Sequence, residues 1–218
     1  VAVSALTGAV QVAVGDNHSC ALLSNGAAKC WGAGNTGQLG NGVLVAESHV
    51  PVNVTSLTGA TAITAGAAHT CVIVGGNVRC WGDNGSGQLG GNFQEPGAAT
   101  PVAVAGLTSI AQVAGGTLHT CARTSGGAAY CWGKNEDAQL GDGTFDDRGA
   151  PVAVSGLAGV TSIAAGNESS CATLTDGHAK CWGRAASGLL GNGEIYRAAD
   201  PQLVLGTRPE TIFANGFQ

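Results

Sequence analysis

The feature that most constrains the fold is a pair of cysteines that recurs four times at a nearly constant interval. The first cysteines of the pairs lie 51, 50 and 50 residues apart, at Cys20, Cys71, Cys121 and Cys171. The second cysteine follows nine or ten residues later, at Cys30, Cys80, Cys131 and Cys181. A sequence period of about 20–50 residues is typical of repeat architectures, in which each unit packs against its neighbours. The chain of 218 residues is therefore predicted to be a four-fold repeat.

Each unit carries short apolar or alternating segments bounded by glycine, asparagine or proline, a pattern that predicts strands. In the first unit these segments are residues 10–14, 19–23, 27–31 and 50–54. The chain has 37 glycines and only 5% aromatic residues, which favours many short strands joined by tight turns over long helices. Four short strands per unit indicate a propeller blade. We expect an all-β protein with four antiparallel strands in each of four blades.

The residues between the paired cysteines are those of hairpin turns, such as Ser24-Asn25-Gly26 and Gly75-Gly76. A hairpin places the two cysteines of a unit opposite one another. We therefore predict one disulfide per blade, and the pairs are Cys20–Cys30, Cys71–Cys80, Cys121–Cys131 and Cys171–Cys181. Disulfides persist in oxidising compartments, so the chain is expected to be secreted or displayed on the cell surface.

Charge and hydropathy exclude two classes of partner. The formal charge is −5 and no run of Lys or Arg occurs, so the sequence lacks the basic patch that nucleic acid requires. No stretch approaches the roughly 20 apolar residues of a membrane-spanning helix. The expected partners are proteins, among them copies of the chain itself.

Histidines stand two residues before the first cysteine in three units, at His18, His69 and His119, and raise the hypothesis of a zinc site. The fourth unit has Ser169 at that position but keeps both of its cysteines. A metal site tolerates the loss of a ligand badly, whereas a disulfide does not need the histidine. We therefore interpret these histidines as hydrogen-bonding core residues and expect no metal.

Acidic residues gather in one loop, where Asp142, Asp146 and Asp147 could offer oxygen ligands to calcium. Their spacing matches neither an EF-hand nor a nonapeptide calcium repeat, and a solvated loop that is partly neutralised by Arg148 is the favoured interpretation. No nucleophile elbow, zinc-protease helix or phosphate loop is present. His49 and His178 depart from the repeat pattern but have no Ser or Cys partner nearby in sequence. We expect neither catalysis nor a cofactor.

The recurring motifs resemble the RCC1 (regulator of chromosome condensation) repeat in its cysteine-bearing, secreted bacterial form. The second unit carries the best copy, which consists of Gly66-Ala67-Ala68-His69-Thr70-Cys71, Cys80-Trp81-Gly82, Gly87-Gln88-Leu89-Gly90 and Pro101-Val102-Ala103-Val104-Ala105-Gly106-Leu107. The resemblance implies a β-propeller, typically of seven blades, that recognises proteins through its loops. Family members include nucleotide exchange factors of a small GTPase, chromatin binders and a secreted inhibitor of β-lactamase.

The resemblance covers residues 1–205, which are expected to form a single repeat domain. Residues 1–8 are expected to add a terminal strand and residues 206–218 to form a C-terminal tail, and the repeats are about 9–58, 59–108, 109–158 and 159–205. Four repeats do not fill a ring of seven blades. The chain could close as a smaller ring, assemble with other chains, or be a piece of a longer protein.

The two ends of the domain carry copies of the same element, residues 1–8 and 201–205. Unpaired edge strands are templates for pairing with another chain, so the ends are candidate assembly segments. Their apolar residues, with those of the tail, are Val1, Val3, Leu203, Ile212, Phe213 and Phe217.

The stretch between the Leu-Gly step and the following proline varies most among the repeats and carries a large apolar residue near its centre. These candidate interaction residues are Leu44, Phe93, Phe145, Ile195 and Tyr196. In a row they would form an extended binding surface; tucked under a neighbouring blade they would be core. The sequence thus predicts a structural or adhesive protein that self-assembles, with a monomeric secreted binder or enzyme inhibitor as the alternative.

Overall fold

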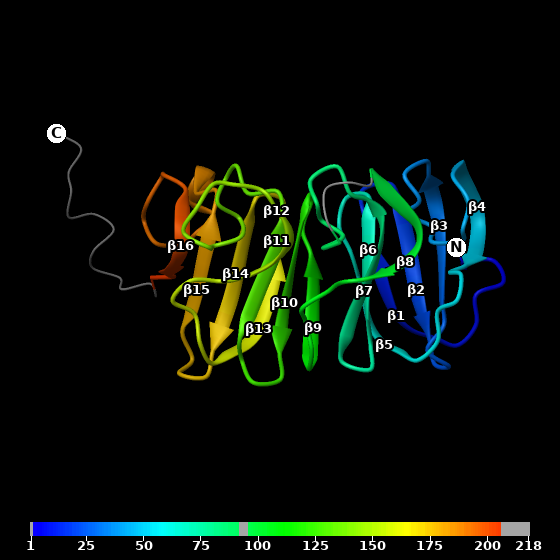
Figure 1. Cartoon of the computed structure of the whole chain (residues 1–218), viewed down its shortest axis with the longest axis horizontal. Helices are drawn as coiled ribbons and strands as arrows, with labels where there is room; N and C mark the ends of the chain where they lie inside the picture. The colour runs from blue at the N-terminus through cyan, green and yellow to red at the C-terminus, as the bar shows by residue number, and fades with distance from the viewer. Residues whose placement is uncertain (1, 92–95, 206–218) are drawn as a thin grey trace.

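The computed structural model describes residues 2–91 and 96–205, which form four antiparallel sheets of four strands each. The sheets stand side by side as blades in a row, with blade 1 at one end of the molecule and blade 4 at the other (Figure 1). The only helix in the described residues is the short 3-10 turn Ala186–Gly188, so no described helix could span a bilayer. The expected all-β fold of four blades is confirmed.

Within each blade the strands follow one another in sequence order, so every neighbouring pair is antiparallel and joined by a turn or loop. Blade 1 holds β1 (Ala9–Val14), β2 (His18–Leu23), β3 (Ala28–Gly34) and β4 (Val45–Asn53). Blade 2 holds β5 (Ala60–Ala65), β6 (His69–Val74), β7 (Asn77–Asp83) and β8 (Gly97–Ala103). Blade 3 holds β9 (Ile110–Gly115), β10 (His119–Thr124), β11 (Ala129–Gly133) and β12 (Arg148–Ala153). Blade 4 holds β13 (Val160–Ala165), β14 (Ser169–Leu174), β15 (Ala179–Gly183) and β16 (Ala198–Leu203).

The first strand of each blade is the innermost one. Contacts run from β1 to β5, from β5 to β9 and from β9 to β13, whereas the fourth strands lie at the periphery. The row of blades is open, because blades 1 and 4 lie at opposite ends of the molecule (Figure 1). One large side of each terminal blade therefore has no described blade beside it.

All four predicted disulfides form, one in each blade. The two cysteines of a pair face each other across the second and third strands, as Cys20 and Cys30 do between β2 and β3. The other bridges are Cys71–Cys80, Cys121–Cys131 and Cys171–Cys181. Each bridge closes a hairpin and none joins one blade to another.

Two strand boundaries differ from the sequence-based expectation. The fourth strand of blade 1 begins at Val45, five residues before the predicted start at residue 50. Residues 2–8 form a turn and coil where a terminal strand was expected. The matching residues of blade 2 are in a strand because β7 lies beside them and pairs Cys80 with Val102; residues 2–8 have no such third strand alongside.

The hydrophobic core lies between the blades. The first buried cluster combines Leu22 and Leu39 of blade 1 with Ile63 and Trp81 of blade 2, and the second and third clusters combine blades 2 and 3 and blades 3 and 4 in the same way. We call the side of a blade that packs on the preceding blade its incoming face, and the side that packs on the following blade its outgoing face. A blade of small side chains thus depends on its neighbours for burial.

Candidate functional site

Each joint between two blades is built around a tryptophan on the incoming face. Nε1 of Trp81 donates a hydrogen bond of 2.9 Å to the backbone oxygen of Gln38 in the preceding blade. The later joints repeat this bond, from Trp132 to Gln88 and from Trp182 to Gln139. The indole packs so closely that a Cβ on Gly40 would lie 2.7 Å from Nε1 of Trp81. This contact explains why the Cys-Trp-Gly and Gln-Leu-Gly motifs recur together.

A histidine on the outgoing face makes the second bond of the joint. Nε2 of His69 lies 2.9 Å from Oγ1 of Thr120 in the next blade, and this hydroxyl donates to the backbone oxygen of Gln88. Because the hydroxyl proton is used in that bond, Thr120 accepts from the imidazole, which must carry its proton on Nε2. The other joints hold the pairs His18–Thr70 and His119–Ser170.

Burial keeps these imidazoles neutral. It lowers the pKa of His18 and of His119 to about 4, and the pKa of His69, which also lies near the other two rings, to about 3. Nδ1 of each ring is buried without a hydrogen-bond partner among the described residues, which adds to the cost of charging the ring. With Nε2 bonded to a hydroxyl of the next blade, the three histidines are buried hydrogen-bonding residues of the joints.

Side-chain amides tie the innermost strands together at two of the joints. Nε2 of Gln11 donates to the backbone oxygen of Ile63 at 2.9 Å, and its Oε1 accepts from the Ile63 N–H at 3.1 Å. Gln112 makes the same pair of bonds to Ile163. Each side-chain amide therefore hydrogen-bonds to the backbone of the next blade as a neighbouring strand would.

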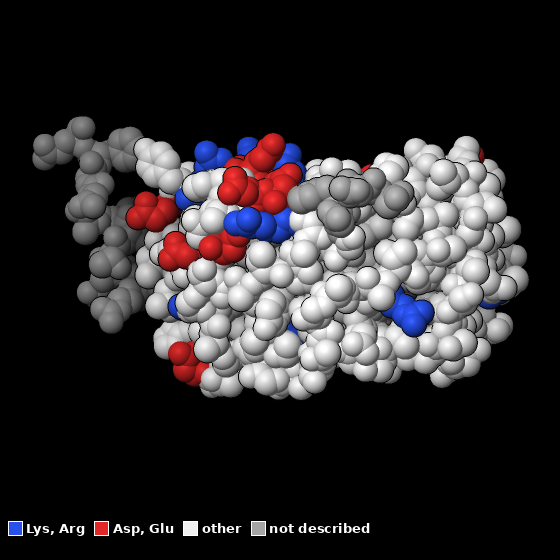
Figure 2. Space-filling model, viewed as in Figure 1, with Lys and Arg blue, Asp and Glu red and all other residues white. Residues whose placement is uncertain are grey.

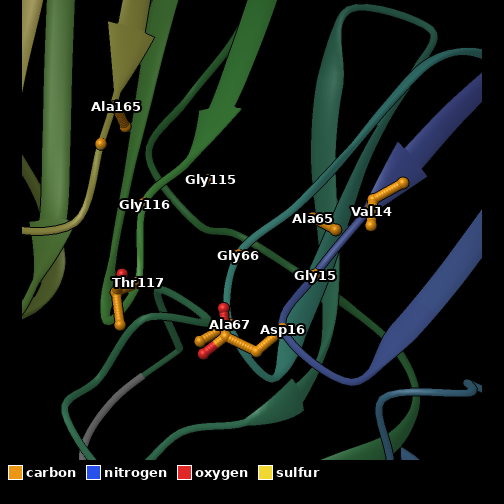
Figure 3. A pocket seen from close by; sticks show the side chains of 11 residues that line it. Val14, Gly15, Asp16, Ala65, Gly66, Ala67, Gly115, Gly116, Thr117 and Ala165 are labelled. Atoms are coloured by element: carbon orange, nitrogen blue, oxygen red, sulfur yellow. The ribbon is translucent and has the colours of Figure 1, made fainter. Parts of the chain in front are cut away.

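A small pocket opens where the innermost strands end (Figure 3), with a volume of about 140 Å³. Its lining is mostly backbone of the turns after β1, β5 and β9, held by the bond from the Asp16 N–H to the Ala67 oxygen and that from the Thr117 N–H to the Gly166 oxygen. Asp16 is the only ionisable residue of the lining. The pocket offers backbone hydrogen-bonding groups and does not assemble an acid–base pair.

The candidate interaction residues lie in the loops between the third and fourth strands, which emerge at one end of the blades (Figure 1). Leu44, Phe145, Ile195 and Tyr196 are all exposed, the last two by 73% and 75%. The guanidinium of Arg197 lies 4.7 Å from the centre of the Phe145 ring, so the loops of blades 3 and 4 touch. Phe93 lies outside the described residues.

Charged side chains gather on the loop end of blades 3 and 4, whereas the rest of the face in Figure 2 is nearly uncharged. In the candidate calcium loop, the Asp142 carboxylate accepts hydrogen bonds from Arg148 and Thr144, and Asp147 accepts from the Asn135 N–H. Burial would raise the pKa of Asp142, but the hydrogen bonds of Thr144 and Arg148 outweigh it and lower the pKa. Asp146 is exposed beside them. The best-buried carboxylate is thus already paired with donors of its own loop.

Family models identify the repeat. The model described as the Regulator of chromosome condensation (RCC1) repeat matches residues 25–73, 75–123 and 126–173, and a second RCC1 repeat model matches residues 9–38, 110–139 and 160–189. The chain belongs to the RCC1 repeat family. The first model spans β3 of one blade to β6 of the next and thus a joint, whereas the second model covers the first three strands of a single blade.

Solved structures with the RCC1 fold include yeast RCC1 (Prp20), crystallised with Kap60, and human WBSCR16. Both are 22% identical to this chain, with TM-scores of 0.85 and 0.82 over 94% and 91% of it. The ectodomain of the Physcomitrella patens receptor kinase CR4 is 25% identical, with a TM-score of 0.53 over 80%. The chain spans 51% of yeast RCC1 and 53% of WBSCR16, about half of each. A comparison with curated protein sequences returned no match.

The incoming face of blade 1 is an RCC1 joint face that no described blade covers. Val12 is 65% exposed, whereas the equivalent residues at the joints, Ile63, Val113 and Ile163, are 3%, 8% and 2% exposed. Trp31 is half-buried, whereas Trp81, Trp132 and Trp182 are fully buried. The face therefore presents the apolar and polar groups of a joint without a partner blade.

Other sequence candidates lie apart from this face. Val3 and Leu203 are exposed at the two ends of the row of blades, while Val1, Ile212, Phe213 and Phe217 lie outside the described residues. His49 and His178 are exposed beside Glu47 and Asp176. The sequence reasoning missed the hydroxyl residue directly before the first cysteine of each RCC1 repeat, which is Ser19, Thr70, Thr120 or Ser170. The presence of a Ser or Thr at this position in all four units was the signal that could have revealed it.

Proposed function

We propose that this RCC1-family chain is an extracellular, non-enzymatic protein with a structural or adhesive role that works by assembling with other propeller blades, copies of itself included, at its open ends. The observation that carries the proposal is the open incoming face of blade 1, where Val12 and Trp31 present a joint surface to solvent. An exposed apolar face of this kind marks a site of protein contact.

Two observations favour an extracellular setting. All eight cysteines are paired in disulfides within single hairpins, and disulfides of structural type persist in oxidising compartments. The CR4 ectodomain, a receptor kinase segment, has the same type of fold.

Self-assembly of identical chains would join the outgoing face of blade 4 to the incoming face of blade 1 on a second copy. Such a contact is heterologous, and it produces a ring if the rotation closes and a filament if it does not. The exposed terminal segments around Val3 and Leu203 lie at these two ends and would be carried into the contact. The two faces are different, so chains would add with a fixed polarity.

Native mass measured without reducing agent tests the proposal. Light scattering and negative-stain imaging of one sample should show particles larger than the 21.3 kDa chain that grow with concentration. Val12→Asp should weaken the association, because it charges the open face. Val10→Asp is the matched control, since Val10 is equally exposed on β1 and its equivalents Thr61, Ala111 and Thr161 are exposed at the joints too.

A chain that stays at 21.3 kDa at every concentration would contradict self-assembly and favour the second candidate, a monomeric secreted binder or inhibitor. The exposed Ile195 and Tyr196 beside the charged loops of blades 3 and 4 support that candidate. Their replacement by serine would then abolish binding of the partner protein while the fold remained intact.

A further inference from the structure

The incoming face of blade 1 keeps the hydroxyl and the indole that receive the preceding blade at the joints. Ser19 stands directly before Cys20, where Thr70, Thr120 and Ser170 receive the histidine of the preceding blade. The Ser19 hydroxyl and Nε1 of Trp31 have no hydrogen-bond partner within residues 2–91 and 96–205, and both residues are half-buried. Val12 supplies the apolar contact beside them.

The three joints of this molecule show what such a face receives. In each of them the preceding blade contributes an imidazole to the hydroxyl and a glutamine backbone oxygen to the indole. The glutamine side chain fixes the turn that presents this oxygen, because its Oε1 accepts the N–H two residues earlier, at Thr36, Ser86 and Asp137. The occupant of the face is thus defined by two groups, an imidazole N–H that donates to the hydroxyl and a backbone oxygen that accepts from the indole.

The outgoing face of blade 4 lacks the imidazole and the glutamine side chain that braces the turn, although Leu189 keeps a backbone oxygen. Ser169 replaces the histidine, and Leu189, which is 56% exposed, replaces the glutamine. A hollow of about 400 Å³ beside Ser169 is lined by Gly166, Leu189 and Arg184, whose guanidinium pairs with Glu168. A second copy of the chain would therefore offer the blade 1 face a contact without the histidine bond and with an unbraced turn.

We propose that the incoming face of blade 1 is a docking site for an RCC1-type blade that presents a histidine and a Gly-Gln-Leu-Gly turn, and that blade 4 of a second copy meets only part of this requirement and binds more weakly. The proposal deepens the proposed function, because it names the partner of the open end. The histidine donates to Ser19, the glutamine backbone oxygen accepts from Trp31, and the last glycine of the turn makes room for the indole. The partner blade therefore belongs to the type of blades 1 to 3.

The test converts blade 4 into the required partner. Ser169→His with Leu189→Gln introduces the imidazole and the bracing glutamine side chain, and Gly166 still leaves room for an imidazole, as Gly66 does for His69. One hydrogen bond and the burial of one apolar face at the joint should tighten self-association about tenfold to a hundredfold. Sedimentation equilibrium measures the gain, and a blue shift of Trp31 fluorescence reports burial of the indole.

Matched variants identify the face. Adding Ser19→Ala or Trp31→Phe to the double variant should return the association to the wild-type level. Val10→Asp should leave it unchanged. Should the double variant fail to fold by circular dichroism, Leu189→Gln alone replaces it, since this side chain is exposed, and an increase of a few-fold is expected.

Three results would overturn the inference: an association equal to that of the wild type, one that survives both Ser19→Ala and Trp31→Phe, or a wild-type chain that already associates as tightly as the double variant. The last result would make blade 4 of a second copy the natural occupant. A monomeric wild type whose double variant assembles through Trp31 would uphold the docking site while removing self-assembly from the proposed function.

Discussion

The joint between blades 2 and 3 and the open face of blade 1 have the same motif in different surroundings. At the joint, Trp132 is buried and bonded to Gln88, and Val113 is in the core. On the open face the equivalent Trp31 is half-buried and Val12 is exposed. The comparison shows that the motif shared by the repeats provides the contacts between blades. Stability in this fold resides in the joints, and a terminal blade has one joint where an internal blade has two.

The strongest test of this comparison is the removal of a tryptophan at a joint and at the open face. Trp132→Ala should lower the free energy of unfolding by about 3–5 kcal/mol, because it empties a packed site and leaves the Gln88 oxygen without its indole donor. Trp31→Ala should cost less than about 1 kcal/mol in the monomer. Urea unfolding followed by circular dichroism measures both, and equal losses would contradict the joint as the unit of stability.

Lowering the pH should destabilise the joints between blades and leave the open face of blade 1 unaffected. The pKa values of the joint histidines lie at about 3 to 4, below the usual 6.5. Between pH 6.5 and 4 these histidines are therefore protonated in the unfolded chain but remain neutral in the folded chain. Their contribution is present above pH 6.5 and is lost as the pH falls toward 4, by roughly 3 kcal/mol per histidine. Unfolding free energies measured from pH 7 to 4 should show the loss, and His119→Asn should reduce its slope.

His49→Asn is the matched control for the acid experiment, because His49 is exposed on β4 and makes no joint contact. If both variants reduced the slope of unfolding free energy against pH equally, the acid response would not come from the joint histidines.

The disulfides of an internal and a terminal blade should differ in how readily reducing agent opens them. Both cysteines of blade 3 are fully buried, whereas Cys171 of blade 4 is partly exposed because no blade covers it. Reducing agent should therefore open Cys171–Cys181 before Cys121–Cys131, as mass spectrometry of alkylated chains would show. Replacing either pair by alanine should cost about 3 kcal/mol through loop-closure entropy, and simultaneous opening of both bridges would speak against this ordering.

The smallest effect is expected from the amide that ties two innermost strands. Gln112→Ala removes two hydrogen bonds to Ile163 and should cost about 1–2 kcal/mol. Gln202→Ala, on exposed β16 at the open end, should change stability by less than about 0.5 kcal/mol. Thermal unfolding of the two variants separates them, and equal midpoints would assign Gln112 no role in the joint.

Local features were predictable from the sequence, and contacts between blades were not. The hairpin chemistry between Cys20 and Cys30 determines their register, so the disulfides followed directly. The bond of His69 to Thr120 joins residues 51 positions apart, and no short-range pattern indicates which hydroxyl receives the imidazole. The strand expected over residues 1–8 is absent from the described residues 2–8 for the same reason. A strand needs a neighbouring strand to pair with, and the repeat pattern does not reveal whether one is present.

The confinement of every disulfide to its own hairpin has a mechanical consequence. Under a pulling force the joints, which no disulfide crosses, are the places where the molecule yields, while each hairpin remains locked. The chain would therefore lengthen in discrete steps, one blade at a time, and each step would be shortened by the residues that its bridge encloses. After release, the hairpins would still be formed and ready to stack again, so a tether built from such blades would absorb repeated stretching without losing its shape.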